Sequence, residues 1–237
     1  MQRLIFDIET IGEDFNELDE VTQDNLTSWI KKDSKNEEDF NIALKDLKKG
    51  MGLSPLTGEI VAIGLLEAEE DRGAVYYQDL DKNPPAGGET DEEGIKYKAM
   101  DEKEMLKKFW EIAKKTDQLI SFNGRGFDVP FLMVRSAVHG IRPSVNLLPY
   151  RYAKHYEVNH IDLLDHLTFL GLMRGRKNLH LWCNAFNIKS PKSKGVSGGD
   201  VQELFKNKKY LDIAKYNVDD LFATRELYKK WKKYLAF

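Results

Sequence analysis

The chain has 237 residues, of which 41% are hydrophobic and 32% charged, and this is enough for a single domain with insertions over residues 1–237. Its one cysteine, Cys183, excludes a disulfide framework within the chain and favours a reducing, cytoplasmic location. No apolar run approaches the length of a membrane span, and the first residues lack the basic and apolar regions of a signal peptide.

Charge is distributed unevenly along the chain. The net charge is only −3, yet residues 1–120 carry 16 Lys and Arg against 29 Asp and Glu, whereas residues 121–237 carry 20 against 10. This asymmetry predicts an anion-facing surface built mainly from the second half of the chain. Ordinary solvated charge spread over helices explains the pattern equally well.

The first strand is expected at Leu4–Thr10, where the sequence reads LIFDIET. Side chains alternate between the two faces of a strand, so Asp7 and Glu9 share one face in the middle of an apolar run. Burying two neighbouring carboxylates is costly unless a cation or hydrogen-bond donors compensate their charge. The run therefore predicts a divalent-metal site at the edge of a sheet. The alternative is a strand end whose acids reach water.

The next segment, residues 13–58, is polar, and its apolar residues recur at helical spacing, which predicts two or three short helices inserted after the first strand. The insertion is expected either to form a cap over the metal-facing end of the strand or to be a plain surface insertion. Strands are then expected at 59–67 and 73–79, and the short link between them indicates an antiparallel hairpin. Residues 81–94 are expected to form a loop.

Strands and helices alternate in the rest of the chain. Asp101 and Glu104 form a capping-box pattern that opens a helix reaching about residue 115. The later elements are a strand at 118–122, a helix at 129–139, a strand at 160–162, and helices at 163–170, 178–185, 200–205 (capped by Asp200) and 211–234. A strand, an antiparallel hairpin and helix-linked strands together predict a mixed α/β sheet flanked by helices.

Two later segments carry further acids. Asp128 follows a strand and the loop Asn-Gly-Arg-Gly-Phe, and taken alone it is explained more simply as a helix N-cap. In the last helix, Tyr216 and Asp220 are four residues apart and share the packed face, although a half-exposed acid explains Asp220 alone. Considered together, the acids on apolar faces fit a two-metal carboxylate site: Asp7, Glu9, Asp128 and Asp220.

Three motifs, in this order, resemble those of DEDD-type 3′–5′ exonucleases: FDIET, ISFNGRGFDVPFL and YNVDD. They are similar in particular to the motifs of the proofreading exonuclease domain of B-family DNA polymerases, and the resemblance extends from residue 4 to about residue 228. It implies a ribonuclease-H-like fold with a helical insertion after the first strand. Because the chain has no room for a polymerase domain, the resemblance also implies a free-standing relative of that exonuclease domain.

The resemblance implies a role for each acid. Asp7 and Glu9 match the first motif, Asp128 the second and Asp220 the third, and the four are implied to hold two divalent ions, Mg²⁺ or Mn²⁺. Asp219 competes with Asp220 for the third position, but the Y-x-x-x-D spacing of the motif favours Asp220.

Tyr216 matches the tyrosine of the third motif, which implies membership of the tyrosine subgroup (DEDDy). Because an unperturbed tyrosine has a pKa of about 10, Tyr216 is a poor base, and we expect it to position the attacking water by a hydrogen bond. The implied reaction hydrolyses phosphodiester bonds from the 3′ end of single-stranded nucleic acid, with DNA as the expected substrate and RNA as the alternative, and releases nucleoside 5′-monophosphates.

Three residues beside the carboxylates are candidate substrate contacts. The resemblance implies that Asn123 holds the 3′-terminal nucleotide or its phosphate, and a turn residue before Gly124 is the alternative. Thr10 and Phe127 adjoin the carboxylates and are expected to contact or stack on that nucleotide, with core packing as the alternative for Phe127. Arg125 is expected either to meet a phosphate or to be a surface charge.

Two other patterns are weaker. His160, Asp162, Asp165 and His166 are of metal-ligand types, but a structural role is favoured because Asp162 fits the cap of the following helix. Asp162 also ends a strand from which it could support the site. The loop at 189–200, with three lysines and three glycines, either follows a nucleic-acid backbone or is a flexible connector.

Two alternatives to a DNA-directed exonuclease use the same fold. An enzyme that trims RNA or degrades oligoribonucleotides would share the site and differ in substrate. A non-catalytic nucleic-acid-binding module is the other alternative, and the presence of all four carboxylates and Tyr216 weighs against it. The acidic first half favours short or weakly held substrates over a long clamped duplex.

Overall fold

A mixed sheet forms the centre of the molecule. The computed structural model describes residues 1–81, 89–173, 175, 178–190 and 198–236. Its strands are β1 (Arg3–Gly12), β2 (Gly58–Glu67), β3 (Gly73–Tyr77), β4 (Glu89–Glu92), β5 (Ile95–Ala99), β6 (Gln118–Ser121) and β7 (His160–Asp162). They pair in the order β4-β5-β3-β2-β1-β6-β7. β1 is antiparallel to β2 and β2 to β3, whereas β6 and β7 run parallel to β1. The predicted hairpin and the predicted mixed α/β sheet are confirmed.

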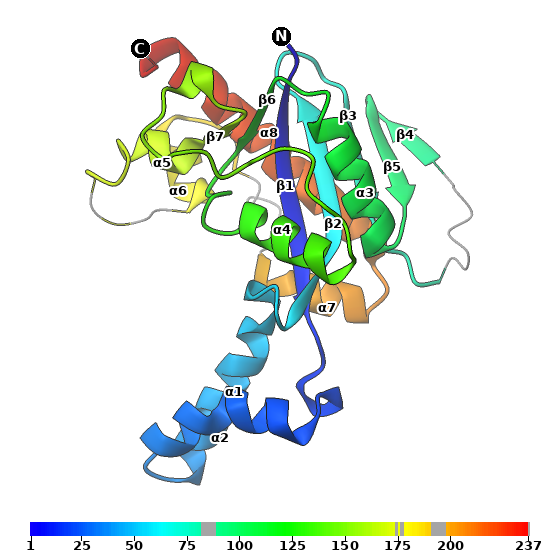
Figure 1. The fold of residues 1–237 in the computed structure, drawn as a ribbon, viewed down its shortest axis with the longest axis vertical. Coiled ribbons are helices and arrows are strands. Elements are labelled where there is room, and N and C mark those ends of the chain that lie inside the picture. The colour runs from blue at the N-terminus through cyan, green and yellow to red at the C-terminus, as the bar shows by residue number, and fades with distance from the viewer. Residues whose placement is uncertain (82–88, 174, 176–177, 191–197, 237) are drawn as a thin grey trace.

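Helices cover both faces of this sheet (Figure 1). The helices are α1 (Glu20–Asp33), α2 (Glu37–Gly50), α3 (Glu102–Ala113), α4 (Asp128–Val138), α5 (Leu163–Leu167), α6 (Leu179–Ala185), α7 (Val201–Lys206) and α8 (Tyr210–Tyr234). α3 and α4 pack on one face, and the long helix α8 crosses the other face together with α6 and α7. None of the helices in the described part of the chain is both long enough and apolar enough to span a membrane.

Alternation along β1 supplies both cores. Leu4, Phe6 and Ile8 are buried in the core beneath α3 and α4, and Ile5 and Ile11 are buried in the core beneath α8. Residues at odd positions of this strand therefore face α8, because successive side chains point to opposite faces. The two acids of β1 stand at odd positions, so the strand directs them toward the last helix.

β1 also has an open edge where these acids lie. Its pairing with β6 covers only its first three residues, because β6 ends at Ser121. Beyond Ile5, β1 pairs with β2 alone among the described residues. Asp7 and Glu9 belong to this stretch, so they lie at a sheet edge next to the place where the chain leaves β6.

The predicted loop at 81–94 is wrong in its second half. Residues 89–92 form β4, which pairs antiparallel with β5, and residues 82–88 lie outside the described part of the chain. A Glu-Gly pair with φ angles of 53° and 84° makes the tight turn between the two strands. Every residue of β4 is exposed, and three of the four are acidic, so neither alternation nor β-propensity marks this edge strand in the sequence.

The insertion after β1 is helical, as predicted. α1 and α2 form a hairpin that projects away from the sheet (Figure 1). In α1 only Thr27 and Ile30 are buried, and α2, which is described in full, has no buried residue. Single 3₁₀ turns join several elements: η1 (Phe15–Glu17), η2 (Met51–Leu53), η3 (His155–Glu157) and η5 (Gly198–Asp200).

Helix ends match the predictions in one case and depart from them in two. The capping box is confirmed, because Asp101 Oδ1 accepts the Glu104 N–H at 2.7 Å. α5 ends at Leu167, before the predicted residue 170, because residues 169–170 have φ angles of 52° and 59°, outside the helical region. Asp200 makes no side-chain cap bond to α7, contrary to its predicted role.

A buried ion pair ties α3 to α4 and to β2. Glu102, 5% exposed, accepts two hydrogen bonds from Arg135 at 2.9 and 2.7 Å and one from the Ile60 N–H at 2.8 Å. It also lies 2.6 Å from His139 Nε2. Burial by itself would raise the pKa of Glu102, but these bonds, led by those from Arg135, outweigh it and lower the pKa.

Replacing Glu102 with Gln should lower the free energy of unfolding by about 3 kcal/mol, because it leaves the guanidinium of Arg135, only 12% exposed, without a carboxylate. Urea denaturation followed by circular dichroism measures the change. Glu111→Gln on the same helix is the matched control, since Glu111 pairs with exposed lysines and should leave the midpoint in place. Equal midpoints for the two variants would contradict this role of Glu102.

Candidate active site

Three acids from distant parts of the chain meet between β1 and α8. Carboxylate oxygens of Asp7, Glu9 and Asp220 all lie within 4.8 Å of one another. Asp7 and Glu9 reach this place because alternation along β1 turns them toward α8, and Asp220 reaches it from within α8. Glu9 is buried, and the other two are partly buried. Carboxylate oxygens grouped in this way can hold a divalent cation.

Asp128 lies at the same open edge of β1. The N-cap explanation for it is wrong, because Asp128 is the first residue of α4 and Phe127 stands at the N-cap position. Asp128 Oδ1 instead accepts the Ile8 N–H at 3.2 Å, a backbone donor that β6 does not reach. This bond holds the start of α4, and with it Asp128, beside the middle of β1, where Asp7 and Glu9 lie.

The four acids oppose one another's ionisation. Burial raises the pKa of Asp7 and Glu9 well above the usual values, and the charges of neighbouring acids raise them further, Asp128 most strongly for Asp7 and Asp220 for Glu9. Burial, with the charges of Asp162 and Asp220, raises the pKa of Asp128 to about 7. A bound divalent cation would reverse these shifts, because an opposite charge favours the ionised form. Hard carboxylate oxygens suit Mg²⁺ or Mn²⁺, so the residues present fit such an ion.

Asn217 holds the two acids of β1 in place, and although it lies within the third motif, YNVDD, the sequence predicted no role for it. Its Nδ2 donates to Asp7 Oδ2 at 2.9 Å and lies 3.5 Å from Glu9 Oε1. Its Oδ1 is buried without a hydrogen-bond partner in the described part of the chain and lies against Gly64, where a Cβ would be only 1.9 Å away. A fully buried amide on the packed face of the last helix is a signal that could have identified it.

Tyr216 shares the same face of α8. Its hydroxyl donates to Asp220, one helical turn further on. Burial raises the pKa of the phenol, and the charges of Asp220 and Glu9 add to this, so the hydroxyl stays protonated. Asp219, the rival for the third motif, points elsewhere: it lines a separate cavity with Tyr97. The geometry therefore brings Asp220, and not Asp219, to the other acids.

Asn123 lies in a loop that Asp162 organises. Asp162 Oδ1 accepts the N–H groups of Asn123 and Leu164, each at 2.9 Å, and Oδ2 accepts the Arg125 N–H at 2.9 Å. The predicted cap of α5 by Asp162 is confirmed. The same carboxylate stabilises the left-handed backbone of Asn123, whose φ is 64°, in the loop that leads to Asp128.

The other candidate substrate contacts are engaged within the chain. Thr10 Oγ1 donates to the carbonyl oxygen of Gly52 at 2.7 Å. Phe127 is partly buried against the core, and its ring centroid lies 5.4 Å from that of Phe131. Contact of Thr10, Phe127 and Asn123 with a nucleotide stays a prediction.

The group around His160 has the structural role that was favoured. His160 is 3% exposed, its Nε2 lies 2.8 Å from Ser121 Oγ, and its Nδ1 lies 2.8 Å from the carbonyl oxygen of Leu147. Both ring nitrogens are therefore occupied within the chain. The predicted loop at 189–200 lies largely outside the described residues, which omit 191–197.

The sequence of most of the chain matches a known family. Residues 58–236 match the model of a family described as predicted 3′–5′ exonucleases related to the exonuclease domain of PolB, and the chain belongs to that family. The match begins at β2, after the strand that carries Asp7 and Glu9. A search of curated proteins returned no match.

The fold is that of a polymerase exonuclease domain. The family B DNA polymerase from the hyperthermophilic archaeon Pyrobaculum calidifontis matches this structure with a TM-score of 0.59 and 16% sequence identity. The match covers 98% of this chain and 24% of the polymerase chain. At that identity the likeness shows the fold alone, and it confirms the predicted ribonuclease-H-like sheet flanked by helices.

In metal-free protein, the contribution of Asp128 to stability should fall as the pH rises from about 4 to about 7. Asp128 ionises near 3.8 when unperturbed and at about 7 in the folded protein, so between these values the folded state binds more protons than the unfolded state. The contribution of Asp128 is complete below the lower value and is lost as the pH passes the upper one. Thermal melting in EDTA across this range measures the effect.

Two comparisons test this explanation of the pH dependence. Asp128→Asn should flatten this part of the profile, because it removes the titrating group. Mg²⁺ or Mn²⁺ should raise the melting temperature above pH 7 and have less effect near pH 4, where the carboxylates are protonated. If neither cation changes the melting temperature above pH 7, the acids do not bind these ions.

Asn217→Ala should weaken Mn²⁺ binding about 10- to 100-fold, because Asp7 loses the amide that orients it. Calorimetric titration of the purified protein measures the affinity. Asn25→Ala, which removes an exposed amide from α1, is the matched control. Equal Mn²⁺ affinities for the two variants would exclude a positioning role for Asn217.

Proposed function

We propose that this chain is a metal-dependent 3′–5′ exonuclease that acts on single-stranded DNA, with RNA as the alternative substrate, and releases nucleoside 5′-monophosphates. The observation that carries the proposal is the meeting of Asp7, Glu9 and Asp220 within 4.8 Å, with Asp128 at the same sheet edge. Membership of a family described as predicted 3′–5′ exonucleases supports it from the sequence.

The acids act as ligands in this proposal. Two divalent cations, Mg²⁺ or Mn²⁺, would be held by Asp7, Glu9, Asp128 and Asp220. When bound, such cations supply Lewis-acid stabilisation of the charge on the attacking and leaving oxygens of a phosphodiester. The chain itself orients the ligands: the Asn217 amide donates to Asp7, and the Ile8 N–H donates to Asp128.

Tyr216 would orient the attacking water. Its hydroxyl stays protonated, since burial and the nearby acids raise its pKa, so it would accept a hydrogen bond from the water while it donates to Asp220, and it does not take up a proton as a base. It stands one turn before Asp220 on the same helix face, which keeps the donor beside the carboxylates. Its contribution is alignment of the water rather than proton transfer.

The open edge of β1 would receive the end of the strand. β6 stops at Ser121, and the chain turns away through Asn123, so no neighbouring described strand fills the edge beside Asp7. Asn123 would hold the terminal nucleotide or its phosphate, and Phe127, next to the ligand Asp128, would stack on the base. Thr10 would contact the same nucleotide from β1.

Purified protein with Mg²⁺ or Mn²⁺ should shorten a 5′-labelled single strand stepwise from its 3′ end, and EDTA should stop the reaction. Single-stranded, blunt and 3′-recessed DNA, with matched RNA strands, reveal the substrate preference on sequencing gels. Because carboxylates alone do not activate water, hydrolysis should require the cation. Intact 3′ ends with every metal and substrate would refute the proposal.

Asp220→Asn should lower kcat roughly 10³-fold, because a bound cation supplies several kcal/mol of transition-state stabilisation. Asp219→Asn is the matched control, since it removes the same charge from the adjacent residue outside the acidic cluster. Comparable losses in both variants would contradict the assignment of Asp220.

Tyr216→Phe should lower kcat about 10²-fold and leave a measurable rate, because the water loses its alignment while the carboxylates stay in place. Single-turnover kinetics on the same labelled strand measure the chemical step. A wild-type rate in this variant would contradict the proposed role of the hydroxyl.

A further inference from the structure

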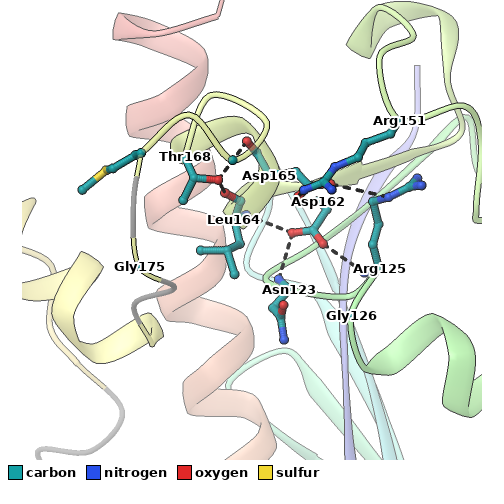
Figure 2. A pocket seen from close by; sticks show the side chains of 11 residues that line it. Asn123, Arg125, Gly126, Arg151, Asp162, Leu164, Asp165, Thr168 and Gly175 are labelled. Carbon is teal, nitrogen blue, oxygen red and sulfur yellow. Dashed lines mark hydrogen bonds and ion pairs between the residues drawn. The ribbon is translucent and has the colours of Figure 1, made fainter.

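A cavity of about 490 Å³ opens beside the candidate active site, at the ends of β6 and β7 (Figure 2). Asn123 and Asp162 line it, so it borders the loop that leads to Asp128. Its volume is in the range of protein pockets that take ligands of nucleotide size. The acids that would hold the metals are not part of its lining, so the cavity is a neighbour of that site rather than the site itself.

Two arginines share one carboxylate on the wall of this cavity. Arg151 Nη2 pairs with Asp165 Oδ1, and Arg125 Nε lies 3.5 Å from Asp165 Oδ2. Figure 2 shows both guanidinium groups converging on the same acid. The other acid of the lining, Asp162, has both oxygens engaged by backbone N–H groups. Asp165 is therefore the acid that pairs directly with both arginines, and the charge of Asp162 acts on Arg151 without a direct pair.

The arginines retain donors for a ligand. A guanidinium carries five N–H donors, and the pair with Asp165 engages Arg151 through Nη2. Arg125 donates from Nη1 to the carbonyl oxygen of Pro149 at 2.9 Å and points Nε at Asp165. Two planar guanidinium forks directed at one anion have the geometry that binds a phosphate.

Exposed aromatic rings flank Arg151. Tyr150 and Tyr152 are 74% and 62% exposed, and their ring centroids lie 5.6 Å apart. Exposed rings beside basic side chains are stacking platforms for unpaired bases, whereas a duplex hides its base faces. The two exposed tyrosines on either side of Arg151 in the sequence therefore favour a single strand as the occupant.

We propose that this cavity binds the single strand upstream of the scissile bond. Arg125 and Arg151 hold an internal phosphate in place of Asp165, and bases stack on Tyr150 and Tyr152. In the absence of a strand, Asp165 occupies the position of that phosphate. The identity of the bound strand as substrate rests on the proposed function, but the binding itself requires no hydrolysis. The site belongs to the half of the chain that carries the excess of Lys and Arg.

Binding can be measured without turnover, by fluorescence anisotropy of a labelled single-stranded oligonucleotide in EDTA. Arg151→Gln should weaken binding about 10-fold and reduce the slope of log K against log salt by about 0.7, because one phosphate contact is lost. Arg142→Gln is the matched control: it removes the same charge from an exposed residue outside the cavity and should change neither quantity.

Asp165→Asn should act in the opposite direction and tighten binding several-fold, because it removes the anion that competes with the phosphate. A bridge that merely holds the loop at residues 149–151 against α5 would be weakened by either substitution, so both variants would then bind less well. Arg151→Gln with wild-type affinity, or a loss of affinity in both variants, would overturn the proposal. Thermal melting confirms that each variant is folded.

A separate substrate distinguishes this site from the proposed function. The p-nitrophenyl ester of thymidine 5′-monophosphate has no upstream phosphate, and Arg151→Gln should lower the ratio of oligonucleotide to ester kcat/KM about 10-fold. Arg151-dependent binding without hydrolysis of strand or ester would refute the exonuclease and support the binding site. Hydrolysis of both substrates with an unchanged ratio in Arg151→Gln would support the exonuclease and overturn the binding site.

Discussion

Repulsion between buried carboxylates is the constraint on which the rest of this structure depends. Asp7, Glu9 and Asp220 are brought within 4.8 Å of one another, and burial raises the pKa of the two acids on β1. The Asn217 amide donates to Asp7, and the Ile8 N–H donates to Asp128. These bonds offset only part of the repulsion between the carboxylates, because a neutral donor stabilises a carboxylate far less than a cation does. The repulsion is relieved when the carboxylates are protonated, and a bound cation would relieve it where they are ionised.

The topology of the sheet converts this constraint into a usable site. A full-length neighbour on the β6 side of β1 would cover the acids and satisfy the backbone beside them, but β6 is only four residues long. The chain then turns and starts α4, whose first side chain returns to Ile8. α8 closes the opposite face and brings its acid and its tyrosine together, because they are one turn apart. The edge of β1, the start of α4 and one face of α8 therefore each contribute acids to the site.

Much of this arrangement could be predicted because its signals are local. The alternation around Asp7, the capping box at Asp101 and the i, i+4 spacing of Tyr216 and Asp220 each occupy a few consecutive residues, and each matches the structure. The exposed acidic strand β4 has no such pattern, since its pairing with β5 depends on a turn and a partner rather than on burial.

The remaining site contacts depend on residues that are remote in the sequence. Asp128 was open to an N-cap explanation because the competing donor, Ile8, lies 120 residues away. Asn217 could not be assigned a partner because Asp7 lies 210 residues away. Asp162 could be identified as a local cap, but its bonds to the loop before α4 exist only after β6 and β7 have paired.

The same separation decides when the chain acquires its acidic cluster. β1 leaves the ribosome before α8, so a nascent chain carries Asp7 and Glu9 long before Asp220 can join them. Domains fold as units, and a strand that lacks its covering helix cannot bury its acids. The acidic cluster, which α8 completes, is therefore absent from every shorter intermediate and forms only with the complete tertiary structure.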